Sequence, residues 1–299
     1  MEGKRSKKKV IIIFLTAAVL CIAVSLAAVF GPEFLKGEVL LGTKDDNGEH
    51  FIKFINVGAA DCMLIKSRGN TALIDFGDIK DGGDAVIRSL RKSGVESVDF
   101  GFISHPHMDH IGGAPAVIEE FSIGTMVMPP LSEFMRSDSE TAISVYETIA
   151  DNCEYKTLKA NDSYKVGEFT VEIIYYNTEF DDINDCSAVF KVSAFGKSLL
   201  TGGDMGPSTE DDLLMTGCDI SADIFKLSHH GSDYSNDFLF VELTGAEYVV
   251  VSSEYDEGFD AKFDILKSVN EKVKVYRTDK NGDISFYFDG GNLKCVTEK

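Results

Sequence analysis

The chain has 299 residues, of which 44% are hydrophobic and 26% charged; this is typical of a globular protein and excludes a disordered one. The net charge of −20 is unevenly distributed, because residues 1–30 carry +4 and the remaining 269 residues carry −24. A body with that charge repels polyanions at long range, which argues against a plain nucleic-acid-binding module.

The N-terminal segment predicts a membrane anchor. Residues 10–30 are uncharged and mostly aliphatic, and as one helix they would span about 30 Å, the thickness of a bilayer's hydrocarbon core. The basic segment 1–9 is expected to remain cytoplasmic, which places the body outside the cell membrane. The alternative is a cleavable signal peptide processed near Ala27, which would make the protein secreted.

A polar linker at residues 31–50 precedes the domain predicted for residues 51–299. Strands at 51–57, 62–67 and 71–77 suggest an antiparallel meander, and a helix over 83–93 with Gly94 as its cap leads to a strand at 98–104. The second half is again rich in strands, with helices between them. Two β-rich halves with helices outside predict an α/β fold in which two sheets form a sandwich covered by helices.

Five of the six histidines fall in two short motifs. His105-Pro106-His107-Met108-Asp109-His110 directly follows a predicted strand, and His229-His230-Gly231 follows another. Imidazole is a preferred ligand of zinc-like cations, and carboxylate extends the choice to manganese. A structural core is a poor explanation for the first motif, because burying several polar rings together costs desolvation energy. The motif therefore predicts a metal site.

Local geometry suggests how the first motif is used. In an extended segment His105, His107 and Asp109 would point to one side, and His110 would turn toward a second metal where a helix begins. Gly112 and Gly113 are expected to allow this turn by adopting backbone angles that other residues avoid. Two carboxylates at strand ends, Asp75 and Asp204, are candidates to orient a ligand or bridge two cations, although each is also a common turn residue.

These residues resemble a known family. HPHMDHIGG is similar to the HxHxDH signature of the metallo-β-lactamase superfamily, and the order of motifs over residues 51–290 resembles the ComEC-like branch of DNA-uptake competence proteins. The motifs in that order are FINVGAADCMLI, LIDFGD, HPHMDHIGG, NDCSAVFKV, LLTGGDM, FKLSHHGSDYS and YRTDKNGDISF. The resemblance implies an αββα sandwich with metals at one sheet edge.

The resemblance also implies two divalent metal ions, zinc or manganese. His105 and His107 would hold the first metal, with Asp204 bridging both ions. The second metal would be held by Asp109, His110 and His229. Asp75 would orient a ligating histidine, and a metal-activated hydroxide would attack the substrate, with Asp109 and Asp204 as catalytic carboxylates. The leaving group or a phosphate oxygen would be contacted by His230, Lys226 or Ser232.

The sequence departs from the family pattern at the first metal. Many members supply a further metal histidine between HxHxDH and the later Asp, but this chain has none from 111 to 228. Asn184, Asp185 and Cys186 are the candidates in that region, in a segment similar to the Asn-containing motif of the competence branch, and Asn184 is expected to lie behind or beside the metal ligands. The branch also tends to carry a histidine after the VVVSS-like strand, and EYDEGFDA has none.

The motifs together predict a hydrolase of phosphodiesters acting outside the membrane, on nucleic acid or on a cell-surface phosphoester. Two closely spaced metals suit attack on phosphorus, because they clamp both the attacking and the leaving oxygen. A single predicted span does not imply DNA import, and no stable protein partner follows from the sequence. The alternatives are a lactone or thioester hydrolase using the same site, and a non-catalytic binding protein that keeps the fold.

Overall fold

The computed structural model describes residues 50–81, 83–137, 139–253 and 272–299. The predicted cytoplasmic segment 1–9, the anchor 10–30 and nearly all of the linker 31–50 lie outside these ranges, so they remain predictions. Within the described ranges, no helix combines the length and the apolar character needed to cross a membrane.

The first sheet has eight strands in the order β15-β14-β1-β2-β3-β4-β5-β6. The predicted meander forms β1 to β3, β14 and β15 extend this antiparallel part, and β3 to β6 run parallel to one another. The strands are β1 (His50–Phe54), β2 (Met63–Ser67), β3 (Asn70–Ile74), β4 (Val98–Phe102), β5 (Ile123–Met128), β6 (Glu154–Thr157), β14 (Ile284–Asp289) and β15 (Asn292–Thr297).

The second sheet has seven strands in the order β13-β12-β11-β10-β9-β8-β7. Strands β7 to β10 are antiparallel, whereas β10 to β13 are parallel. The strands are β7 (Ser163–Val166), β8 (Phe169–Tyr175), β9 (Val189–Ala194), β10 (Lys197–Thr201), β11 (Ile224–Lys226), β12 (Tyr248–Val251) and β13 (Lys274–Arg277).

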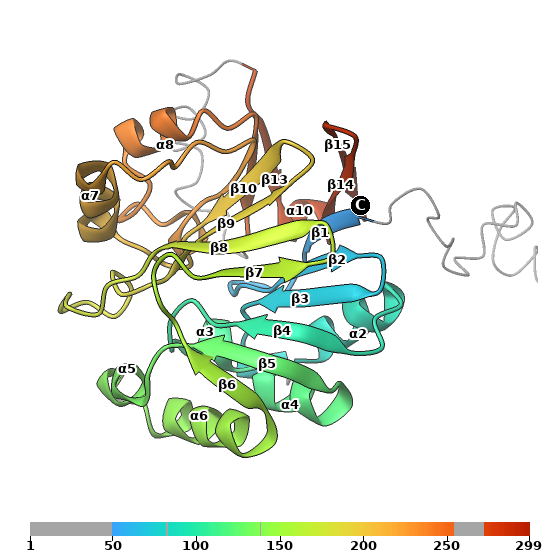
Figure 1. The fold of residues 1–299 in the computed structure, drawn as a ribbon, viewed down its shortest axis with the longest axis vertical. Coiled ribbons are helices and arrows are strands. Elements are labelled where there is room, and N and C mark those ends of the chain that lie inside the picture. The colour runs from blue at the N-terminus through green and yellow to red at the C-terminus, as the bar shows by residue number, and fades with distance from the viewer. Residues whose placement is uncertain (1–49, 82, 138, 254–271) are drawn as a thin grey trace, which may run out of the picture. The chain divides into compact units, whose positions relative to one another are not determined.

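Helices cover the outer face of each sheet, which confirms the αββα sandwich for the described residues (Figure 1). The first sheet is covered by α2 (Asp84–Lys92), α4 (Ala114–Glu120) and α6 (Glu140–Asn152), and the second by α7 (Pro207–Thr216) and α8 (Phe238–Thr244). Shorter elements are η2 (Ile79–Asp81), α3 (Met108–Ile111), α5 (Leu131–Arg136), η3 (His229–Gly231) and α10 (Thr278–Asn281). Gly94 follows α2 at φ 62°, as its predicted role as a cap requires.

An apolar layer joins the two sheets. In β8 the burial of side chains alternates along the strand, so that Phe169, Val171 and Ile173 face this layer. Phe102 of β4 meets Phe190 of β9 with ring centroids 5.7 Å apart and planes at 65°, an edge-to-face arrangement that aromatic quadrupoles favour. The layer therefore fixes the position of one sheet on the other.

Both sets of parallel strands end at the same edge of the sandwich. Loops that follow the carboxyl ends of parallel strands lie together, which makes this edge the natural place for a site. The loops after β3 and β4 carry Asp75 and the 105–110 motif, and the loops after β10 and β11 carry Asp204 and the 229–231 motif. The fold thereby brings together residues that lie more than a hundred positions apart.

Removing a ring from the layer between the sheets should destabilise the protein strongly. Phe190 is fully buried, and we expect Phe190→Ala to lower the free energy of unfolding by about 3–5 kcal/mol, measured by chemical denaturation. Met215→Ala is the matched control, because that side chain is 81% exposed at the end of α7; we expect a change within about 0.5 kcal/mol. Equal effects of the two substitutions would contradict this assignment of the core.

Candidate metal centre

The 105–110 motif changes conformation in its middle. His107 has extended backbone angles (φ −74°, ψ 149°), and α3 begins at Met108, so the alternation expected through Asp109 stops after His107. Asp109 and His110 instead lie on the first turn of α3. His105 and His110 are fully buried, while His107 and Asp109 are partly exposed.

The two glycines after the motif are required by close contacts and not by unusual backbone angles. Gly112 and Gly113 have φ −61° and −80°, which any residue adopts, so the expected reason for them is wrong. A Cβ on Gly112 would lie 2.3 Å from the Ile79 nitrogen, and one on Gly113 would lie 2.2 Å from the Phe76 oxygen. The loop after β3 therefore packs directly on the backbone of the motif.

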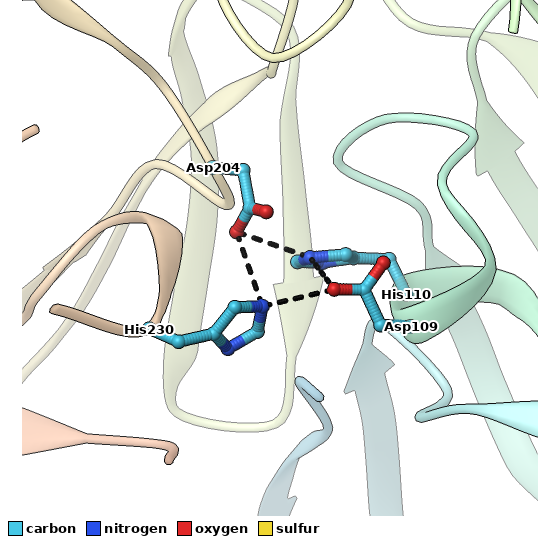
Figure 2. Close-up of side chains that lie close together, drawn as sticks. All are labelled: Asp109, His110, Asp204 and His230. Atoms are coloured by element: carbon cyan, nitrogen blue, oxygen red, sulfur yellow. Dashed lines mark hydrogen bonds and ion pairs between the residues drawn. The ribbon is translucent and has the colours of Figure 1, made fainter. Parts of the chain in front are cut away.

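Four side chains converge at the sheet edge: Asp109, His110, Asp204 and His230 (Figure 2). The His230 Nε2 lies 3.0 Å from Asp109 Oδ2 and 3.6 Å from Asp204 Oδ1. The His110 Nε2 lies 3.1 Å from Asp204 Oδ1 and 3.8 Å from Asp109 Oδ2. One candidate ligand atom from each residue lies within 4.8 Å of all the others, a spacing at which one cation can be shared.

A second set of imidazoles faces the other oxygen of Asp204. Asp204 Oδ2 lies 3.9 Å from the Nε2 of His105 and 3.9 Å from the Nε2 of His229. The ring of His105 in turn contacts that of His107, with Nε2 and Nδ1 3.1 Å apart. Asp204 is thus placed between two groups of nitrogen atoms, as a bridging carboxylate requires.

The sequence predicted His229 beside Asp109 and His110, but the structure places His230 there. Both residues have left-handed backbone angles, φ 52° and 53°, and the centroids of their rings lie 6.4 Å apart with the ring planes at 71°. His230 Nδ1 is 3.0 Å from the Ser252 carbonyl, which leaves its Nε2 directed at the cluster. The side chain of His229 is 30% exposed.

Polar contacts hold this strained turn in place. Asn236 accepts from the Ser228 amide and donates to the Ser228 carbonyl, and the His229 amide donates to the carbonyl of Gly203. The buried Glu210 of α7 accepts from the amides of Asn236 and Asp237. Nothing in the sequence pattern had singled out Asn236 or Glu210, because their role depends on contacts between separate elements.

Asp75 contacts His110 on the Nδ1 side of its ring, away from Asp204. Its carboxylate accepts from the amide and hydroxyl of Ser104, at 2.8 Å each, and lies 2.8 Å from His110 Nδ1. Asp75 adopts φ 59°, a region that is uncommon for residues other than glycine and often marks a functional position. Burial raises the pKa of this carboxyl, while the adjacent His110 acts in the opposite direction. The contact directs His110 Nε2 toward Asp204.

Charge is unevenly shared within the cluster. Burial alone would lower the pKa of His110, but Asp204, Asp75 and Asp109 hold it well above its ordinary value. Burial and the neighbouring His110 lower the pKa of both His105 and His107, which favours their neutral, metal-binding forms. For Asp204, burial would raise the pKa, but His110 and His230 hold it well below its usual range.

The residues present fit a metal centre. Among the described residues, His110 Nε2, Asp204 Oδ1, His229 Nδ1 and Asn184 Oδ1 are buried atoms without hydrogen-bond partners. Buried polar atoms are normally satisfied, and the facing pair His110 Nε2 and Asp204 Oδ1, 3.1 Å apart, fits a shared cation. The Asn184 side chain lies within hydrogen-bond reach of His107, beside the second set of imidazoles. Lys226, a candidate substrate contact from the sequence, is buried and pairs with Asp61.

Residues 55–163 match the family profile described as "Metallo-beta-lactamase superfamily". The competence protein ComA of Neisseria gonorrhoeae is 25% identical over 236 residues, which cover 78% of this chain and 31% of that protein. The ComE operon protein 3 of Bacillus subtilis (strain 168) is 22% identical over 267 residues, covering 81% of this chain and 33% of that protein. The chain thus spans about a third of the length of these relatives.

The fold also matches a solved structure of the metallo-beta-lactamase fold protein YhfI from Bacillus subtilis, with a TM-score of 0.52 and 11% identity over 83% of this chain and all of that one. The predicted αββα sandwich is thereby confirmed, and the superfamily profile over residues 55–163 agrees with the predicted enzyme class. The His and Asp cluster is in keeping with the divalent metals that this fold binds. The described domain thus has the metallo-β-lactamase fold, residues 55–163 match the profile of that superfamily, which generally consists of hydrolases, and the chain resembles the ComEC-like competence branch.

Proposed function

We propose that the protein hydrolyses phosphodiesters with two divalent metal ions, zinc or manganese, at an extracytoplasmic site tethered by residues 10–30. One observation carries the proposal: the two oxygens of the buried Asp204 face different imidazoles, His110 and His230 on one side and His105 and His229 on the other. That geometry suits two cations sharing one carboxylate.

The distances between the imidazole nitrogens and the carboxylate oxygens suggest which residues would bind each metal. His105, His107 and Asp204 would hold the first metal, with Asn184 beside His107. Asp109, His110, His230 and Asp204 would hold the second. Two such ions supply an acidified water and a clamp for the attacking and leaving oxygens of a phosphodiester.

The protein's own groups would orient the metal-binding histidines and contact the substrate. Asp75 contacts Nδ1 of His110, and the Ser252 carbonyl contacts Nδ1 of His230. Both rings therefore direct Nε2 to the metal face, which we define as the side of the cluster formed by Asp109 and Asp204. His229 Nε2 lies as far from Asp204 Oδ2 as that of His105 does, but the His229 side chain is 30% exposed, so we assign it to a contact with a phosphate oxygen or a leaving group. It would thus take the role that the sequence assigned to His230.

The names of the relatives favour a phosphodiester over the other substrates, and the charge of the body does not exclude it. The acidic body repels a polyanion at long range, but two divalent cations neutralise one phosphate locally. The relatives are competence proteins by name, so nucleic acid is a reasonable polymer to test, together with small cell-surface phosphoesters. Lactones and thioesters serve as the competing substrates in the same panel.

Metal content and turnover test the site directly. Purified protein should contain close to two equivalents of transition metal by mass spectrometry and hydrolyse bis-p-nitrophenyl phosphate. His107→Ala and Asp204→Ala should each lose metal and at least about 100-fold in rate, because each removes a ligand. His50→Ala is the control, since His50 lies in β1, outside both motifs. Wild-type protein with less than one equivalent of metal would refute the proposal.

The two histidines of the turn should behave differently. We expect His230→Ala to lose one metal equivalent, because its Nε2 faces Asp109 and Asp204. His229→Ala should keep both metals and lose turnover, because its ring is partly exposed at the substrate side. Metal analysis combined with steady-state kinetics separates the two outcomes, and the reverse pattern would restore the assignment expected from the sequence.

The location is tested by accessibility. Protease added to intact bacterial cells that express the full chain should digest the body, and deletion of residues 1–30 should leave the protein in the soluble cytoplasmic fraction. Protection of the body in intact cells, together with its digestion after lysis, would contradict an extracytoplasmic site. The metal and turnover experiments do not depend on this result.

A further inference from the structure

A buried ion pair lies on the Nδ1 side of His110 and His230 and has no role in the proposed hydrolysis. Lys226 at the end of β11 pairs with Asp61 from the loop between β1 and β2. Both side chains are buried, 4% and 8% exposed. Removing two charges from water costs several kcal/mol, and such pairs often add nothing to stability compared with apolar residues of similar volume. A structural purpose alone is therefore a poor explanation for this pair.

Asp61 contacts the metal face through several groups. Its amide donates to the Asp109 carbonyl at 3.1 Å, and its carbonyl accepts from the Gly77 amide at 2.8 Å. Its carboxylate Oδ2 lies 3.9 Å from His110 Nδ1, and Oδ1 lies 3.7 Å from His230 Nδ1. Among the described residues, Oδ1 has no hydrogen-bond partner. The carboxylate therefore lies behind both imidazoles of the second metal position.

We propose that Asp61, fixed by Lys226, is a positioning residue that keeps the proton of His110 and His230 on Nδ1 and leaves both Nε2 atoms free for the metal. A negative charge near Nδ1 stabilises the tautomer that carries hydrogen there. Asp75 and the Ser252 carbonyl accept these hydrogens directly, and Asp61 adds a charge common to both rings. Lys226 holds the carboxylate in place and keeps its own charge balanced.

This inference rests on the proposed metal centre, but not on the substrate. The test is the double variant Asp61→Asn/Lys226→Met, which removes both charges and avoids leaving one of them buried alone. We expect it to fold with wild-type stability in the absence of metal, and to bind the second metal equivalent about 10- to 100-fold more weakly by titration with Co²⁺. Binding of the first equivalent should be unchanged.

A spectroscopic readout separates positioning from simple packing. Long-range ¹H–¹⁵N NMR of the six imidazoles should show His110 and His230 of the metal-free protein at high pH as Nδ1–H tautomers, and as mixtures in the double variant. Lys197→Met/Asp223→Asn is the control, because this ion pair lies where β10 and β11 begin, at the ends of these strands away from the metal face. It should change neither readout.

The outcomes are distinct. If the wild type binds metal and the double variant shows the same affinities and tautomers, the positioning role is wrong while the hydrolase proposal stands. If the wild type binds no metal, the proposed function itself fails. Should the double variant not fold, Asp61→Asn alone provides the tautomer measurement, and unchanged Nδ1–H tautomers there would overturn the inference.

Discussion

The position of the Asp204 carboxylate constrains the rest of the site, because each of its oxygens faces a separate set of imidazoles. A buried carboxylate is costly unless charge or hydrogen bonds compensate it. His110 and His230 approach one oxygen, and His105 and His229 approach the other. The surrounding loops must hold these imidazole rings close to the Asp204 carboxylate, since a small displacement would leave its charge unpaired.

The sandwich meets this demand through its topology. Parallel strands in both sheets end at one edge, so β3 and β4 present Asp75 and His110, while β10 and β11 present Asp204 and His230. The apolar layer between the sheets fixes the distance between these two sets of loops. A densely packed protein interior has low compressibility, so it can hold the residues of a site in a narrow range of positions.

Part of the backbone strain lies at the site, which holds three of the seven non-glycine residues with positive φ in the described ranges. Asp75, His229 and His230 all have left-handed φ angles, and each is held by contacts from another element. Asn236 and Glu210 secure the turn that carries the two histidines. Strain of this kind persists only where the surrounding structure determines it, which is why these supports are as much a part of the site as the ligands.

The sequence alone indicated the fold class and named most of the residues that the structure brings together, because side-chain type and strand periodicity are local properties. The motifs identified His105, His107, Asp109 and His110, and placed Asp204 with them. Only the tertiary structure decided that His230 and not His229 joins Asp109, since the direction of each ring depends on the left-handed turn after β11. Likewise Asp61 and Lys226, 165 positions apart, became partners only through the contact of two sheets.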